Sequence, residues 1–169
     1  AYSSRAGIRV KIIVPSKVDV GRLSQMIVFG ADIEEYGDVI DDAIDRSIVI
    51  AGRFGYYQAT AELNALSIEG LKTMAFEIFE EEGCPDNIII PAGSGLSAYS
   101  IYVGFRELYD TGMIDRIPSI HIVQSESHHP IVDTVNEQKG GGSSNEKVIK
   151  GLDVREPLYG EVVSKIVKN

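Results

Sequence analysis

Hydrophobic and polar positions alternate along this chain with two different periods. Short apolar runs, typical of buried strands, are separated by stretches in which apolar residues recur every three or four positions, as on one face of a helix. The runs predict strands at Ile8–Val14, Asp32–Tyr36, Asn87–Pro91 and Ser119–Val123, with a short crossing strand at Tyr56–Thr60. Strands that alternate with helices predict an α/β fold with open, mostly parallel sheets and helices on both faces.

The expected helices lie between these strands and carry recognisable end signals. They are expected from Ser16 or Asp19 to Gly30, from Asp38 to Gly52, from Ser67 to Gly83, from Ala98 to Tyr109 and from Leu158 to Val167. Asp38 is expected to cap the second of these helices. Its inner face is expected to consist of Ile40, Ala43, Ile44 and Ile48.

The breaks in this pattern predict the domain organisation. Glycines at Gly52–Gly55 and an expected loop at Glu62–Leu66 divide the chain into two lobes, residues 1–60 and 61–169. The run Asn87–Pro91 is apolar on both faces, so we expect it to be a central parallel strand covered by helices on both sides. Gly140–Ser144 has the composition of a flexible loop.

The first residues of the chain have the pattern of an unfinished element. Ala1–Gly7 reads as the last turns of a helix closed by a glycine, with no preceding residues to begin it. We therefore expect the chain to be part of a longer polypeptide.

Composition and charge narrow the class of protein. The chain has 169 residues, of which 16 are basic and 25 acidic, so its net charge is −9 and nucleic-acid binding is disfavoured. No apolar run approaches the roughly 20 residues needed to cross a bilayer. Cys84 is the single cysteine, which suits a reducing compartment and a structural role. These features predict a soluble cytoplasmic protein.

The loop Gly93–Ser97 is the most informative local motif, because it joins a buried strand to the start of a helix. Glycines allow close approach to the backbone, and the helix N-terminus attracts anions, so a phosphate group is the expected ligand. A tight turn that needs glycine for its backbone angles is an equally good explanation of the motif alone. A dinucleotide site is disfavoured because Gln124 stands where an acidic residue would be expected, and no Gly-Lys-Ser/Thr follows the loop.

Other reactive side chains are better explained without chemistry. Asp41, Asp42 and Asp45 are expected on a solvated helix face, and Lys72 on the surface or at a lobe contact. His121 is expected in a strand, and His128 and His129 in a turn before a helix. No metal site is predicted.

Five blocks of sequence resemble the threonine synthase family, in order and at matching intervals. They are Ser67–Ile78, Pro85–Gly95, Gly104–Leu108, Ile114–Pro118 and Val123-Gln124. The similarity extends over about residues 1–135. It implies the fold of the fold-type-II pyridoxal-phosphate (PLP) enzymes, which is tryptophan synthase β-like and places the cofactor between two α/β lobes.

The resemblance assigns roles to both parts of the chain. Residues 1–60 would be the remainder of the small cofactor lobe, and 61–169 part of the large lobe with the loop for the cofactor phosphate. That loop would consist of Gly93, Ser94, Gly95, Leu96 and Ser97, with Leu96 where many relatives have glycine. Asn64 would be an active-site neighbour, although Ala65 replaces the proline that often follows it in relatives.

The implied enzyme is a lyase that converts O-phosphohomoserine and water to threonine and phosphate, with an amino-acid phosphate as its small-molecule substrate and a homodimer as its assembly. The family's Schiff-base lysine would lie upstream of Ala1, so this chain is expected to contain no catalytic residue and to be inactive alone. Two alternatives stay open: a threonine or serine dehydratase of the same fold, and a non-catalytic anion-binding module that has kept the fold.

Overall fold

The chain forms two compact units, Ala1–Thr60 and Ala61–Asn169. The structure is a computed structural model, and it describes residues 1–137, 152 and 154–167. The predicted flexible loop at 140–144 lies outside the described residues. None of the described helices is both long enough and apolar enough to cross a membrane.

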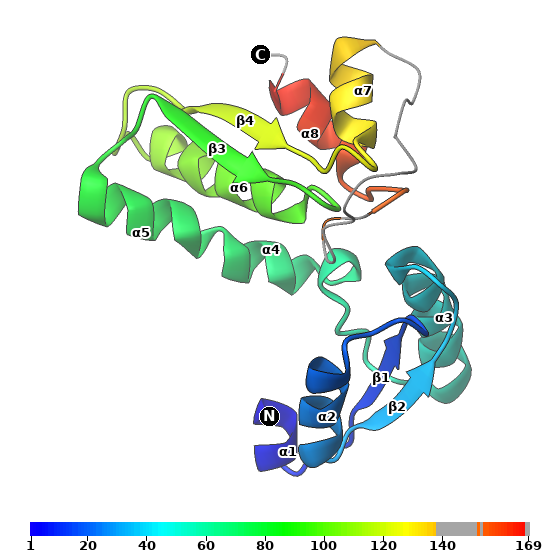
Figure 1. The fold of residues 1–169 in the computed structure, drawn as a ribbon. Coiled ribbons are helices and arrows are strands. Elements are labelled where there is room, and N and C mark those ends of the chain that lie inside the picture. Colours follow the sequence, from blue (N-terminus) through cyan, green and yellow to red (C-terminus); the bar gives the residue numbers. More distant parts are fainter. Residues whose placement is uncertain (138–151, 153, 168–169) are drawn as a thin grey trace. The chain divides into compact units, whose positions relative to one another are not determined.

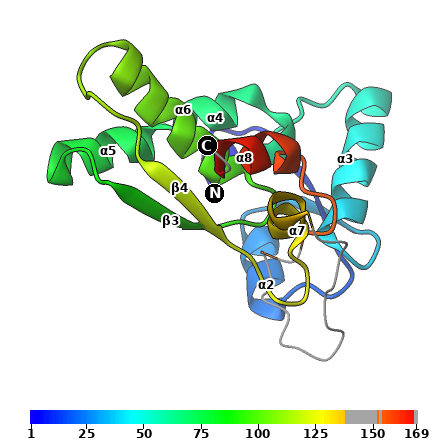
Figure 2. The same cartoon turned by 90° about the horizontal axis from the view of Figure 1, so that it is seen from above.

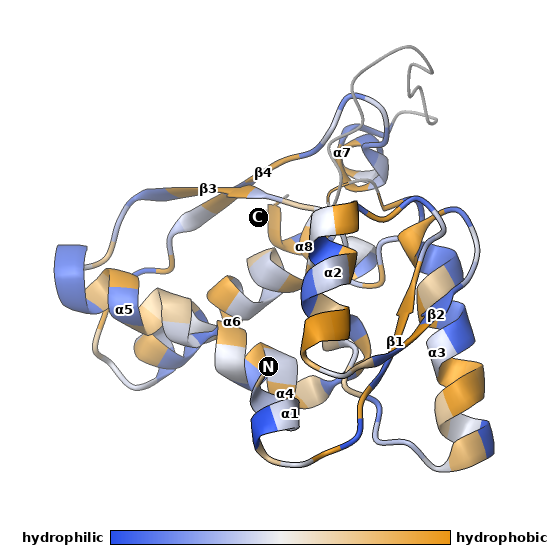
Figure 3. Ribbon diagram, turned by 60° about the horizontal axis from the view of Figure 1, so that its bottom comes forward, coloured by the Kyte–Doolittle hydropathy of each residue, from blue (hydrophilic) through white to orange (hydrophobic). Residues whose placement is uncertain are grey.

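The first unit contains a two-stranded parallel sheet between helices (Figure 1). Strand β1 (Lys11–Val14) is aligned with β2 (Asp32–Glu35), so that Lys11 lies opposite Asp32. A short helix α1 (Tyr2–Arg5) precedes β1, and α2 (Val20–Val28) joins the two strands. Helices α2 and α3 (Ile40–Phe54) lie on opposite sides of the sheet, which has hydrophobic residues along β1 (Figure 3).

Carboxylates bind N–H groups at the starts of α2 and α3, but one of these caps differs from the prediction. Asp19 caps α2 as expected and accepts hydrogen bonds from the N–H groups of Gly21 and Arg22 at 3.1 and 3.2 Å. The prediction that Asp38 caps α3 is wrong. The carboxylate of Asp42, in the first turn, instead reaches back and accepts from the N–H groups of Asp38 and Val39.

The inner face of α3 is also only partly as predicted. Ala43 is buried, but Ile40 and Ile48 are 41% and 49% exposed, while Ile50 is buried. A two-stranded sheet is narrower than the apolar stripe of a four-turn helix. The described part of the first unit therefore leaves the edges of that stripe in solvent.

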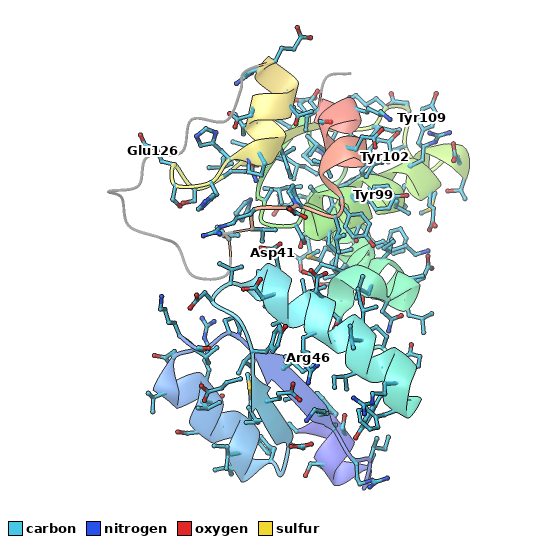
Figure 4. All side chains as sticks on the ribbon, turned by 90° about the vertical axis from the view of Figure 1, so that its right-hand side faces the viewer. Asp41, Arg46, Tyr99, Tyr102, Tyr109 and Glu126 are labelled. Atoms are coloured by element: carbon cyan, nitrogen blue, oxygen red, sulfur yellow. The ribbon has the colours of Figure 1, made fainter. Side chains whose placement is uncertain are left out.

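Charged side chains connect α3 to the sheet of the first unit. Glu34 accepts a hydrogen bond from Arg46 Nε at 2.6 Å and pairs with Lys11 Nζ at 3.1 Å. The Arg46 guanidinium and then the Lys11 ammonium lower the pKa of Glu34. Arg46, labelled in Figure 4, also lies over the ring of Tyr36, 5.2 Å from its centroid. These contacts hold α3 against the β1–β2 sheet, and the charges of Glu34, Arg46 and Lys11 are paired with one another.

The segment between the two units is not the strand and loop that the sequence predicts. No strand is found at Tyr56–Thr60, where the side chain of Gln58 accepts from both the N–H and the hydroxyl of Thr60 and so replaces a strand partner. The expected loop at Glu62–Leu66 is largely helical, with the 3-10 turn η1 (Ala61–Leu63) followed by α4 (Ala65–Leu71).

The second unit has a layered arrangement (Figures 1 and 2). Its parallel strands β3 (Asn87–Pro91) and β4 (Ser119–Val123) pack against α6 (Leu96–Asp110), and α6 packs in turn against α4 and α5 (Thr73–Glu82). The bounds of both strands are those predicted from the sequence. Helices α7 (Pro130–Asn136) and α8 (Gly160–Val167) pack against each other, and α8 also contacts β4 and α6.

The core of the second unit lies on one face of its sheet. Phe105 and Ala75 are fully buried between α6 and α5, and Ile90 of β3 is 5% exposed. The prediction that β3 is covered on both faces is wrong for the described residues, because Ile89 is 71% exposed. No described helix covers that side of β3.

Candidate functional site

The carboxyl ends of β3 and β4 lie side by side and carry the predicted phosphate loop. Because the strands are parallel and in register up to Pro91 and Val123, the residues that follow them meet at one edge of the sheet. The N–H of Ala92 donates to the carbonyl of Val123 at 2.9 Å, which extends the pairing by one residue. This edge is where open α/β sheets place their ligands.

The predicted loop Gly93–Ser97 overlaps the start of a long helix, because α6 begins at Leu96 and not at Ala98 as the sequence predicts. Gly95 has a φ of +86° and is the residue from which α6 begins. In the described part of the chain no side chain caps this helix, and the nearest contact is a long one, 3.5 Å from the N–H of Leu96 to the hydroxyl of Ser94. The first-turn N–H groups of a four-turn helix, together with its dipole, therefore face the mouth of the loop.

Gly95 is required by its surroundings as well as by its backbone angles. A Cβ added to it would lie 3.2 Å from both Tyr159 and Val163 and 3.4 Å from Ile131. Ile131 and Val163 are fully buried, so they form a rigid floor beneath the loop. The loop is thus supported by α7 and α8, which come from the far end of the chain.

Tyr159 makes three separate contacts around the loop. Its N–H donates to the carbonyl of Ser94 at 3.0 Å, and its ring stacks on Tyr99 with centroids 5.5 Å apart. Its hydroxyl donates to the carbonyl of Glu62 at 3.3 Å, and burial raises the pKa of that phenol. Tyr159 was not identified from the sequence, since a contact across 97 positions leaves no local pattern.

Asn64 lies two residues beyond Glu62, and its side chain caps the helix that follows it. Its carbonyl oxygen accepts from the N–H of Leu66 at 3.0 Å and so caps α4. Through Glu62 and Tyr159 this helix start is connected to Ser94 of the loop. The structure therefore connects the Asn64 segment to the loop through Glu62 and Tyr159.

Gln124 connects the two strand ends to α7. Its amide nitrogen donates to the carbonyl of Ala92, and its oxygen accepts from the N–H groups of Ile131 and Val132. Two buried serines follow, Ser125 and Ser127, whose hydroxyl oxygens are 2.6 Å apart. Between them Glu126 is exposed (Figure 4).

His121, His129 and Cys84 have hydrogen-bond partners within the fold. His121 bonds to Asn87 across the strands at 2.9 Å, and His129 bonds to Asp133 one turn into α7 at 2.8 Å. Burial raises the pKa of the Cys84 thiol, which keeps it in its unreactive form. Among the described residues no three His, Cys, Asp or Glu side chains are grouped as metal ligands.

Every lysine in the described part of the chain pairs with a carboxylate. They are Lys11, Lys17, Lys72 and Lys165. Lys72 has the least exposed side chain of the four. Its Nζ lies 2.8 Å from Glu107 and 2.6 Å from Glu69. The carboxylate of Glu107 and then that of Glu69 raise the pKa of Lys72, so its amine is protonated and not nucleophilic at neutral pH.

A cavity of about 660 Å³ lies in the first unit, away from these groups. Its walls come from α1, β1 and α2 and are mainly apolar, with Arg9 and Arg22 among the lining residues. It contains none of the predicted site residues and no carboxylate, histidine or cysteine. Nothing in its lining suggests acid–base or nucleophilic chemistry.

The donors of the Gly93–Ser97 loop suit a phosphate ester. The five residues include no acid, and they offer backbone N–H groups and the hydroxyls of the half-buried Ser94 and Ser97. Neutral donors at a helix N-terminus stabilise a dianion without a paired cation. Position, donor set and rigid floor together make this loop the best candidate binding site in the described residues.

Comparisons with known proteins point to enzymes that use pyridoxal phosphate. All 169 residues match the family model described as pyridoxal-phosphate dependent enzyme. A threonine synthase of Methanocaldococcus jannaschii is 33% identical over 82% of this chain, which corresponds to only 35% of that protein's length. Maize serine racemase has a similar fold, with a TM-score of 0.72 at 15% identity over 99% of this chain and 48% of its own. A threonine deaminase from Solanum lycopersicum is similar at a TM-score of 0.68 and 15% identity, over 96% of this chain and 46% of its own.

Proposed function

Because this chain belongs to the family of pyridoxal-phosphate-dependent enzymes, we propose that it is part of a threonine synthase and that Gly93–Ser97 holds the phosphate of the cofactor. The observation that carries the proposal is the uncapped start of α6 at the carboxyl edge of the β3–β4 sheet. The similarity to a threonine synthase at 33% identity favours this member of the family.

The described residues bind and orient the cofactor rather than react with it. The N–H groups at Gly95, Leu96 and Ser97 and the hydroxyls of Ser94 and Ser97 are the donors for the phosphate. Bound pyridoxal phosphate would supply an electron sink for carbanions formed on the substrate. The floor of Ile131 and Val163 excludes water from below the loop and holds its donors at fixed positions.

The two units take separate parts in this proposal. Residues 1–60 would belong to the small cofactor lobe and residues 61–169 to the large lobe, with Asn64 as an active-site neighbour. The reaction would convert O-phosphohomoserine and water to threonine and phosphate. We further propose a cytoplasmic homodimer, in which exposed residues near the end of α6, Tyr109 and Met113, belong to the contact between subunits (Figure 4 labels Tyr109).

A lysine that bonds covalently to the cofactor is not expected among the described lysines. On incubation of the chain with pyridoxal phosphate at pH 7, followed by borohydride reduction and peptide mapping, we expect only weak and unselective labelling. Lys72 in particular should be labelled less than Lys17, because its side chain is 15% exposed and bound to two carboxylates, whereas that of Lys17 is 80% exposed. Stoichiometric label on Lys72 at pH 7 would contradict this assignment.

The catalytic proposal is tested with the full-length polypeptide that contains these 169 residues. We expect it to release equal amounts of phosphate and threonine from O-phosphohomoserine. Release of ammonia from threonine or serine, with no action on O-phosphohomoserine, would instead identify a dehydratase. Binding of pyridoxal phosphate with neither reaction would favour a non-catalytic module.

A further inference from the structure

Gln124 is placed where one side chain can hold both the phosphate loop and the helix beneath it. It follows β4 directly and is half-buried. Its Nε2 donates to the carbonyl of Ala92 at 3.3 Å, and Ala92 immediately precedes Gly93. Its Oε1 accepts from the N–H groups of Ile131 and Val132 at 2.8 and 3.1 Å.

The bonds to Ile131 and Val132 replace a cap that α7 does not have in its own sequence. His129 occupies the N-cap position, but its side chain makes no capping bond. Pro130, the first helical residue, has no N–H to satisfy. The two N–H groups that an N-cap side chain would normally serve are therefore those that Gln124 serves from a neighbouring strand.

The same helix carries the floor of the loop. Ile131 is 1% exposed, and its Cδ1 lies 3.4 Å from the position that a Cβ would take on Gly95. Fixing the start of α7 thus fixes the surface on which Gly95 rests. Gln124 acts on the loop from two sides, through the carbonyl before Gly93 and through Ile131 below Gly95.

Only a side chain that both donates and accepts can make these contacts. A carboxylate of the same length could accept from Ile131 and Val132 but would face the carbonyl of Ala92 with no proton to share. A methionine of similar length would leave all three main-chain groups without this partner. The position therefore requires both the amide N–H donor and the amide oxygen acceptor of glutamine.

We propose that Gln124 is the positioning residue of the phosphate loop: it sets the geometry of Gly93–Ser97 without touching the ligand. This inference rests on the proposed function for its ligand, since the loop is taken as the phosphate site. Whether Gln124 orders the loop is independent of the proposed function, because it concerns the loop without a ligand. We call this the mechanical part of the inference.

The mechanical part is tested by amide hydrogen exchange on the ligand-free chain, corrected for global stability. In Gln124→Met we expect exchange to accelerate by about tenfold or more at Ile131 and Val132 and at the hydrogen-bonded amides beside the loop, Ala92 and Tyr159. In Gln124→Glu, protection at Ile131 and Val132 should be retained while Ala92 and Tyr159 still exchange faster. Leu108→Ala, a buried truncation at the other end of α6, serves as a control of comparable stability loss and should leave the loop unchanged.

The ligand part is tested by titrating the same variants with inorganic phosphate. Gln124→Met should weaken binding at residues 93–98 about tenfold, and Leu108→Ala less than twofold. Equal affinity of Gln124→Met and the unmodified chain, or unchanged loop exchange, would overturn the inference and leave the proposed function standing. If the unmodified chain binds no phosphate at 93–98, the proposed function fails, and the exchange result alone decides whether Gln124 orders the loop.

Discussion

Replacement of Gly95 by aspartate is expected to reduce the affinity of the chain for pyridoxal phosphate by at least about 100-fold. Three effects act together. The φ of +86° is unfavourable for a residue with a side chain, and the new Cβ would meet Tyr159 and Val163 at 3.2 Å. The carboxylate would stand among the phosphate donors, where like charges 4 Å apart repel by about 4 kcal/mol at an effective dielectric constant near 20.

A matched control is available at the other end of the same helix. Gly112 has a φ of +74°, but nothing lies within 4 Å of an added Cβ. Gly112→Asp therefore introduces comparable backbone strain and the same charge, away from the loop. Equilibrium dialysis with pyridoxal phosphate should show near-normal binding for Gly112→Asp. Similar binding by Gly95→Asp and Gly112→Asp would show that the phosphate lies elsewhere.

The second large effect is expected on stability, at Gly104→Ala. A Cβ at Gly104 would lie 2.5 Å from the carbonyl oxygen of Lys72 and 2.7 Å from the Cβ of Ala75. Both are held in place where α4 gives way to α5 against α6, so the helices must separate. We expect a loss of about 3 kcal/mol in the free energy of unfolding.

Gly70 offers the control for this change. It also lies in a helix, but nothing is within 4 Å of an added Cβ, so Gly70→Ala should be neutral or stabilise by up to about 1 kcal/mol. Urea denaturation of the two variants measures the difference directly. Equal stability of Gly104→Ala and Gly70→Ala would mean that α4, α5 and α6 do not pack as closely as described.

The Gly104 contact also explains why two blocks of the family pattern belong together. The two blocks, Ser67–Ile78 and Gly104–Leu108, contact each other in the fold. Gly104 leaves room for the backbone of Lys72, and Glu107 pairs with the Lys72 amine at 2.8 Å. From the sequence each block is merely a helix with an apolar face. Their mutual dependence becomes visible only in the packed structure.

The sequence predicts best where the signal is local. The limits of β3 and β4 follow from uninterrupted apolar runs, and the loop before α6 follows from its glycines and serines. The crossing strand at Tyr56–Thr60 was wrong, because Gln58 satisfies the backbone of Thr60 locally. Asp38 was wrong as a cap, since Val39 is the N-cap residue and the first-turn carboxylate of Asp42 binds the N–H groups of Asp38 and Val39.

The supports of the loop could not be predicted from the sequence. Tyr159 and Ile131 reach Gly95 from distant positions, and their types are those of ordinary core residues. Gln124 was noted because it is not acidic and because Val123-Gln124 belongs to the family resemblance, and not as a support of the loop. Its role depends on three main-chain groups from two other segments, which no spacing along the chain reveals.

Gly93–Ser97 is proposed to bind the phosphate of the cofactor. The most direct test follows the backbone amides of the 169-residue chain by nuclear magnetic resonance while inorganic phosphate is added. We expect saturable shifts that are largest at residues 93–98 and absent in Gly95→Asp. Shifts that cluster elsewhere, for example around Arg9 and Arg22 in the cavity of the first unit, would contradict it.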